Sequence, residues 1–536
     1  MAGGARAIFE AIPRQHQFRF VSAGDLRKPM DGLPPALRQS NHDKEYQLRI
    51  NAEISKRISR LRGLSRLPEC FTFEGQNRRL DEVAAKNIYE GQKLKIESDN
   101  RLSSGAFSPL SRESMLPFTA GMLREGDARK TGRPGVLFES PQDFLKAFDE
   151  GLELWRGAAG GIGAVGVLDV AGGAGTRAAR DLVGCGDYAE NYGVDAVTPR
   201  SLYPIEHANR NTFKGILINN IRAFSRKLGI PTPVFVMINE ENAGRFADYV
   251  RTSKEAAPWD EDVIFWNQRV LQRFDVGDTT HPLGRFFPAG HGDNAILAYQ
   301  YGILQAMKSL GIKYIGSSNG DEFLWYYLFP ALIAKMNALE AKMLAIAVAN
   351  VAKQKGGLFN SDGQLTETNR VPFEYEDRVP EVVNTTFYLL HNDTMIKGAE
   401  VEKEGASEVP NIVCKDTWEE INGKNRYINM VGADSWMGDE FSGMIADAFG
   451  EIKILEGPRN IFLGMKSPIQ VVGRQPQEYL FSRALHHNLS LSQFYTMMAN
   501  KVTRVLDVLL YGDKKARLSL AEQLFANNFE LIDVEI

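Results

Sequence analysis

Cysteine is scarce in this sequence. Its three cysteines, Cys70, Cys185 and Cys414, lie far apart in a chain of 536 residues. An odd number of widely separated thiols offers neither a disulfide framework nor the paired spacing of a zinc site. These features favour a reducing compartment, and we predict a cytoplasmic protein.

The sequence also lacks an excess of positive charge and a long apolar run. Its formal net charge is -4, which gives no broad positive field for non-specific nucleic-acid binding. The N-terminal segment has no continuous apolar core of the kind found in signal peptides. The most apolar stretch, Leu324 to Ala352, is interrupted by a proline and several charges, so it falls short of the roughly 20 apolar residues of a membrane helix. We interpret it as buried helices and expect neither membrane nor nucleic acid as a partner.

The pattern along the chain predicts three regions. Residues 1–155 mix charged helical patterning with Pro- and Ser-bearing connections, which predicts a mainly helical N-terminal region. Residues 156–475 alternate short β-rich runs with helix-length segments, as in an α/β domain with a mixed, mainly parallel sheet. Residues 476–536 place Leu, Phe, Met and Val at helical spacing, which predicts a helical C-terminal cap.

The first β-rich run of the second region leads into a glycine-rich turn. The segment VLDVAGGAGTR, residues 167–177, contains Gly172, Gly173, Gly175 and Arg177. Glycines let the backbone approach a nucleotide and offer N–H donors to phosphate, while the arginine supplies a fixed charge. The same spacing also matches a degenerate dinucleotide fingerprint, so this motif alone leaves an NAD-dependent dehydrogenase open.

This segment resembles the loop of UDP-glucose and UDP-N-acetylhexosamine pyrophosphorylases, which reads roughly GGxGTRxGxxxPK. In the present sequence the Pro-Lys comes late, after an apparent insertion, as Pro199-Arg200. The resemblance implies that Arg200 replaces a phosphate-contacting lysine. A guanidinium keeps the charge but not the geometry of an ammonium. The alternative is a surface arginine in a loop.

Two further segments resemble the base-binding parts of that family. Residues 263–275 (VIFWNQRVLQRFD) nominate Gln268 for the uracil, because an amide can pair with a donor and an acceptor on a base edge. Residues 286–294 (FFPAGHGDN) are similar to the family's PPGHGD and nominate Gly290 and His291 for the base and for a phosphate or ribose. A surface glutamine and a structural turn are the alternatives.

The segment KYIGSSNGDEF resembles the family's strand that ends in SNxDN. Carboxylates at strand ends of open α/β sheets lie beside the ligand. The resemblance implies that Asp321 binds Mg²⁺ through oxygen and that Asn319 faces the sugar. Glu322 stands where the family has asparagine. A solvated acidic turn is the alternative.

More segments follow in the family's order. They nominate Lys355, Glu367 and Asn384 for the sugar. GPRNIFLGMKS is similar to the family's PRSRFLPVKT, so Lys466 is expected to reach the triphosphate. Taken singly, each of these residues is of a type that usually lies on a solvated surface. Their shared order is the stronger indication.

The resemblance as a whole implies a Rossmann-like nucleotidyltransferase core that joins a sugar 1-phosphate to UTP and releases pyrophosphate. Glucose 1-phosphate is the default sugar substrate. Arg177, Arg200 and Lys466, together with Mg²⁺, are the expected catalytic charges. A catalytically inactive UDP-sugar-binding homologue is the main alternative, because the substituted lysine could mark lost chemistry. The dehydrogenase is a weaker alternative, since it leaves the GHGD segment and Lys466 unexplained.

Overall fold

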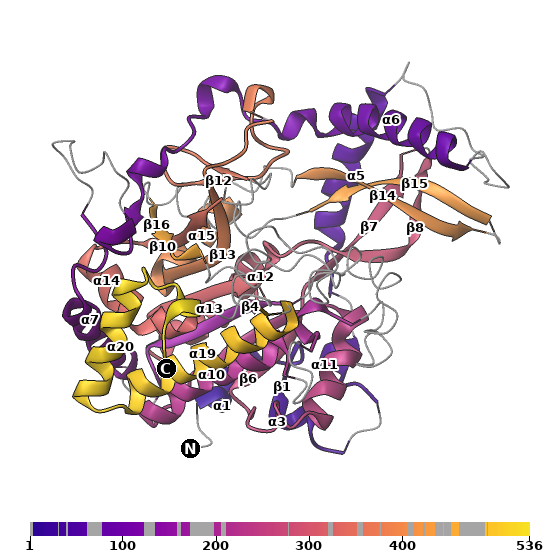
Figure 1. Cartoon of the computed structure of the whole chain (residues 1–536). Helices are drawn as coiled ribbons and strands as arrows, with labels where there is room; N and C mark the ends of the chain where they lie inside the picture. The colour runs from indigo at the N-terminus through magenta and orange to yellow at the C-terminus, as the bar shows by residue number, and fades with distance from the viewer. Residues whose placement is uncertain are drawn as a thin grey trace.

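The computed structural model shows a protein built around two β-sheets (Figure 1). It describes residues 4–29, 32–38, 41–61, 78–122, 135–157, 162–171, 198–204, 211–276, 278–319, 325–350, 357–375, 377–404, 411–421, 424–434, 443, 452–459, 488–489 and 491–536.

The larger sheet has nine strands in the order β1-β6-β5-β4-β9-β13-β10-β16-β3. Their bounds are β1 Phe20–Ser22, β6 Val263–Asn267, β5 Val234–Ile238, β4 Val165–Val170, β9 Tyr314–Asn319, β13 Val382–His391, β10 Met343–Ala349, β16 Lys453–Gly457 and β3 Leu116–Pro117. All of these strands run in one direction except β1 and β13, which are antiparallel to their neighbours. The predicted mixed, mainly parallel sheet is therefore confirmed.

The strand order reverses beside β4. From β4 the chain proceeds to β5 and then β6 on one side, and it returns to place β9 on the other side of β4. Consecutive residues of β4 enter opposite core clusters, with Val167 on one face and Leu168 on the other. A strand buried on both faces reads as a continuous apolar run, as VGVLDV nearly does. The sheet thus has a topological switch point between β4 and β9.

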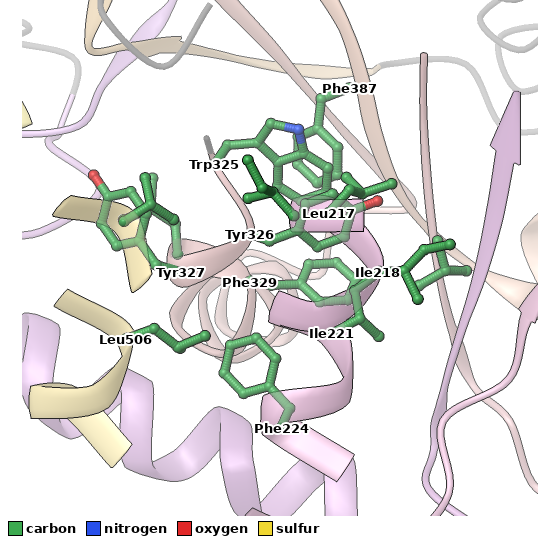
Figure 2. Close-up of a cluster of buried hydrophobic side chains, with 14 of the residues drawn as sticks. Leu217, Ile218, Ile221, Phe224, Trp325, Tyr326, Tyr327, Phe329, Phe387 and Leu506 are labelled. Atoms are coloured by element: carbon green, nitrogen blue, oxygen red, sulfur yellow. The ribbon is translucent and has the colours of Figure 1, made fainter. Parts of the chain in front are cut away.

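Helices cover both faces of this sheet. One core cluster includes side chains of α7 (Pro141–Arg156), α10 (Phe213–Leu228), α11 (Glu240–Thr252), α14 (Phe329–Ala338), α19 (Leu491–Tyr511) and α20 (Lys514–Ala526). Figure 2 shows part of this cluster, where apolar side chains of α10 lie close to aromatic residues of the segment 325–329, which leads into α14. The other face carries α1 (Gly4–Ala11), α12 (Asp293–Gln300), α13 (Ile303–Ser309) and α15 (Asn392–Glu404).

The second sheet has five strands, in the order β14-β15-β7-β2 with β8 paired to β7. Their bounds are β14 Ile412–Ile421, β15 Lys424–Ala433, β7 Arg269–Asp275, β2 Asn41–His42 and β8 Asp278–Pro288. Helices α5 (Lys44–Ser59) and α6 (Arg78–Glu97) pack on this sheet, at the upper right of Figure 1. Only Gln268 separates β6 of the large sheet from β7 of the small one.

Several predicted elements are confirmed and one is wrong. The C-terminal helices are α19 and α20, and α5 and α7 match the helical patterning of the N-terminal region. That region also supplies β1, β2 and β3, which the helical prediction did not include. The interpretation of Leu324 to Ala352 as helices is wrong for its second half, where MLAIAVA forms β10. A short apolar run has the same appearance in a buried strand and in a buried helix.

No helix in the part of the chain that the structure describes is long and apolar enough to span a bilayer.

Candidate functional site

The carboxyl ends of the parallel strands meet at one edge of the large sheet. Val170 at the end of β4 is in register with Asn319 at the end of β9. The antiparallel strand β13 begins at the same edge, because its Asn384 is in register with Ala347 near the end of β10. In open α/β sheets ligands bind outside the carboxyl ends, at the switch point. The strand ends of β4 and β9 are therefore the candidate site.

The strands that precede several predicted site segments end at this edge. The glycine-rich segment follows β4, the segment with Asp321 follows β9, that with Lys355 follows β10 and that with Lys466 follows β16. The residues Gly172, Gly173, Gly175, Arg177, Asp321, Lys355 and Lys466 lie outside the described residues. For Arg200 only the backbone is described, at the start of the 3₁₀ helix η7 (Arg200–Leu202) beside α10. The roles of these residues stay predictions.

Two buried amides hold the end of β4. The Nδ2 of Asn242 donates to the carbonyl of Ala171, the last described residue before the glycine-rich segment, at 2.9 Å. Asn242 is itself fixed by a capping box with Asn239, the N-cap of α11. On the other face of the sheet the Nδ2 of Asn294 donates to the carbonyl of Leu168 at 3.3 Å. Sequence reasoning missed both amides, although a polar cap after a buried strand is a recognisable helix start signal.

The structure brings together Asn319 and Asn384, two residues nominated for the sugar. Thr386 links them, because its Oγ1 accepts from Asn319 Nδ2 at 2.9 Å and its N–H donates to Asn384 Oδ1 at 3.1 Å. Thr386 has a φ of 60°, which is uncommon for a β-branched residue. The register against β10 also slips here, since Ala345 faces Tyr388 while Ala347 faces Asn384. Such bulges re-aim side chains and are frequent beside active sites.

Of the base-binding candidates, Gln268 follows β6, two strands from β4, and Gly290 and His291 lie in the turn before α12. Gln268 is 1% exposed, so it is not the surface glutamine of the alternative interpretation, and its N–H donates to the carbonyl of Ile238 at 2.9 Å. Gly290 has a φ of 120°, a conformation that side chains rarely adopt. His291 is half-buried in the turn before α12, where its carbonyl accepts from the N–H of Asn294.

Glu367 lies in a separate turn after β12 (Leu365–Thr366). Its carbonyl accepts from the N–H groups of Arg370 and Val371, and this turn is joined to residue Leu102 by the bond from the Leu102 N–H to the Arg370 carbonyl. Its nominated contact with a sugar stays a prediction.

Buried ion pairs next to the strand ends were also missed from the sequence. Lys214 of α10 pairs with Asp169 of β4, and both side chains are 0% exposed. Arg269 at the start of β7 pairs with Asp293 at the start of α12, with side chains 4% and 0% exposed. The four residues are far apart along the chain, so no local sequence signal identifies these pairs.

The described residues contain no group of three or more His, Cys, Asp or Glu side chains that could hold a metal ion. Asp321 lies outside them, so magnesium stays a prediction from the motif.

Fold and site together define an α/β protein whose candidate site lies at the switch point of a mainly parallel sheet. No protein-family model matches the sequence, and no curated protein matches it. Among solved structures, the chain is similar to the uridine diphosphate N-acetylglucosamine pyrophosphorylase of Trypanosoma brucei in complex with inhibitor. The identity is 14%, the TM-score is 0.49, and the match covers 90% of this chain and 96% of that chain.

Other similar structures are a UDP-glucose phosphorylase of Trypanosoma brucei, with 16% identity and a TM-score of 0.47, and the UDP-glucose pyrophosphorylase of Leishmania major, with 14% identity and a TM-score of 0.46. Each match covers 79% of this chain and 78% of the other chain.

Proposed function

We propose that this protein is a nucleotidyltransferase that joins a sugar 1-phosphate to UTP, forming a UDP-sugar and releasing pyrophosphate. One observation carries most of the support. The glycine-rich segment follows β4 at the switch point of the sheet, and the ends of β6, β9 and β13 that carry Gln268, Asn319 and Asn384 lie at the same edge. Segments separated by hundreds of residues therefore meet where a nucleotide binds in such folds.

The proposed reaction is an in-line displacement. An oxygen of the sugar 1-phosphate forms a bond to the α-phosphorus of UTP, and the bond to the bridging oxygen breaks so that its electron pair leaves with pyrophosphate. Arg177, Arg200 and Lys466 neutralise the phosphates, which repel each other when the two substrates approach. Magnesium bound at Asp321 would add positive charge at the same phosphates.

The chain's own polar groups position the two substrates. The buried amide of Gln268 reads the base edge, where water does not compete for the hydrogen bonds. Asn319 and Asn384, held together through Thr386, bind sugar hydroxyls. Because the reaction needs no covalent intermediate, positioning and charge neutralisation account for catalysis.

The dehydrogenase alternative is the weaker one because it leaves the GHGD segment and Lys466 unexplained. In dinucleotide-binding folds an acidic residue near the end of the second strand binds the ribose. The strand after β4 is β5, and Asn239, Glu240 and Glu241 follow it, so this position does not separate the two classes. The inactive UDP-sugar-binding homologue differs from the proposed enzyme only in turnover.

The test is pyrophosphate release from UTP with a panel of sugar 1-phosphates, glucose 1-phosphate first. Release that depends on both substrates supports the proposal. Binding of UDP-sugar without turnover supports the inactive homologue instead, and absence of both binding and turnover contradicts the proposal.

Asn384→Ala tests whether the strand ends are the site. We expect kcat/KM for the sugar 1-phosphate to fall about fivefold or more, since one lost substrate hydrogen bond is worth on the order of 1 kcal/mol or more. The matched control is Asn337→Ala, which removes an amide bonded to the Tyr314 hydroxyl at the opposite end of β9. It should leave kcat/KM within about twofold, and equal losses in both variants would contradict the assignment.

A further inference from the structure

Arg269 lies immediately after Gln268 and is tied to both ends of the turn that contains His291. Its Nε donates to Asp293 Oδ1 at 3.1 Å, and its backbone N–H donates to Asp293 Oδ2 at 3.2 Å. At the other end of the turn, the N–H of Ala289 donates to the Arg269 carbonyl at 3.0 Å. One residue thus fixes the distance between the β6 end and the turn 289–293.

The other side of the same guanidinium faces the N-terminal region. Arg269 lies 3.8 Å from the centroid of the Tyr46 ring, and its Nη1 is 3.7 Å from Asp43 Oδ2. Asp43 caps α5 by accepting from the N–H of Tyr46 at 2.9 Å. Gln47 continues the contact, because its Oε1 accepts from the N–H of Gln272 at 2.6 Å. The first turn of α5 therefore supports Arg269 from outside the large sheet.

The surroundings of Arg269 favour its charged form. Burial alone would lower the pKa of Arg269, but the negative charge of Asp293, with contributions from Tyr46 and Asp43, raises that pKa above its usual value. Arg269 is therefore cationic at neutral pH.

Stability alone does not explain why a full ion pair is buried here. Removing two charges from water costs several kcal/mol per ion, and well-packed apolar residues of similar volume are often as stable. What an apolar pair would not supply is a bidentate, directional link between two segments. Those two segments are the ones that carry Gln268 and His291.

We propose that Arg269 is a positioning residue that sets the nucleotide-base selectivity of the enzyme. With Asp293 and Tyr46 it holds the Gln268 amide and the turn 289–293 in one arrangement. In that arrangement only the edge of a uracil forms hydrogen bonds with the amide and with the turn together. The inference rests on the proposed function and assigns part of the N-terminal region, α5, to nucleotide recognition.

The test compares Arg269→Lys and Tyr46→Leu with wild type, using UTP and CTP as alternative substrates. Arg269→Lys keeps the charge but cannot form the planar, two-pronged contact. We expect the ratio of kcat/KM for UTP to that for CTP to fall about tenfold, while KM for the sugar 1-phosphate stays within about twofold. Tyr46→Leu removes the ring that lies against the Arg269 guanidinium and, at 5.4 Å, near that of Arg49, and a smaller fall of about threefold is expected.

The matched control is Arg222→Lys. Arg222 pairs with Asp262 at 2.7 Å, and Asp262 directly precedes β6, at the opposite end of that strand from Gln268. This variant should keep the selectivity of wild type. Unchanged selectivity in Arg269→Lys would overturn the inference. An equal loss of kcat/KM with UTP, CTP and the sugar 1-phosphate would also overturn it, because it would show a merely structural role.

Failure of the proposed function gives a different result. A wild-type protein without turnover contradicts the enzyme activity, and the selectivity is then measured as the ratio of UDP to CDP dissociation constants. A wild type that prefers UDP and an Arg269→Lys variant that does not would still support the positioning role. Equal preference in the two proteins would overturn it.

Discussion

The buried ion pair of Lys214 and Asp169 permits a quantitative prediction. Lys214 lies in the first turn of α10, and its Nζ donates to Asp169 Oδ2 on β4, two residues before Ala171. Replacing Lys214 with methionine keeps an unbranched side chain but leaves the carboxylate buried without its ammonium partner. Removing one member of a buried pair costs about 3–5 kcal/mol, a large share of the roughly 5–15 kcal/mol by which proteins are stable.

The double variant Lys214→Met, Asp169→Val should recover most of that loss. It buries no charge, and valine suits a strand position between two apolar neighbours. Apolar replacement of a buried pair is typically neutral, or stabilising by about 1–4 kcal/mol. The double variant is therefore expected to be more stable than Lys214→Met alone.

The assay is urea unfolding followed by tryptophan fluorescence on wild type, both single variants and the double variant, analysed as a double-mutant cycle. We expect a large favourable coupling between the two residues. A loss below about 0.5 kcal/mol in Lys214→Met, the range of ordinary surface substitutions, would refute the reasoning, as would a double variant that is no better than Lys214→Met.

The remaining predictions concern packing and pH. Gly151→Ala should destabilise the protein by about 1–3 kcal/mol or more in urea unfolding, because a methyl carbon there would lie 1.7 Å from the Pro330 carbonyl oxygen between α7 and α14. Gly244→Ala in α11 meets nothing within 4 Å and should stabilise by about 0.5–1 kcal/mol, so a shared sign for the two variants would contradict the packing argument. Burial raises the pKa of Glu97 above its ordinary 4.5. The folded state therefore holds the proton of Glu97 more tightly than the unfolded state does. The stability that this proton contributes is fully present below pH 4.5 and is lost as the pH rises through the pKa of the folded state. Glu97→Gln should remove this loss. In urea unfolding the variant should become increasingly stable relative to wild type as the pH rises from 4.5. Parallel plots of unfolding free energy against pH for the two proteins would contradict this prediction.

Elements with a strong local pattern could be predicted from the sequence. β4 and β5 are short, mainly apolar runs bounded by turn residues, and α5 and α7 begin directly after Asp43 and Ser140, which cap them through side-chain oxygens. Such signals lie within a few residues of each other, so no knowledge of the tertiary structure is needed. The helix prediction was wrong for the residues of β10, because a short apolar pattern fits both a helix and a strand.

The candidate site was predictable only in part. The motif order nominated Asn319 and Asn384, but their link through Thr386 depends on a register slip in β13 that no local pattern encodes. The pair of Arg269 and Asp293 depends on how the small sheet continues from the large one, and the two residues come from different elements. Contacts of this kind follow from strand register and topology, which a single sequence specifies only through the whole fold.

The most direct test of the central claim is a crystal structure of the protein soaked with UTP. We expect the triphosphate beyond the carboxyl ends of β4 and β9, with the uracil within hydrogen-bond reach of Gln268. A nucleotide bound elsewhere, with no density for it at these strand ends, would contradict the proposed site.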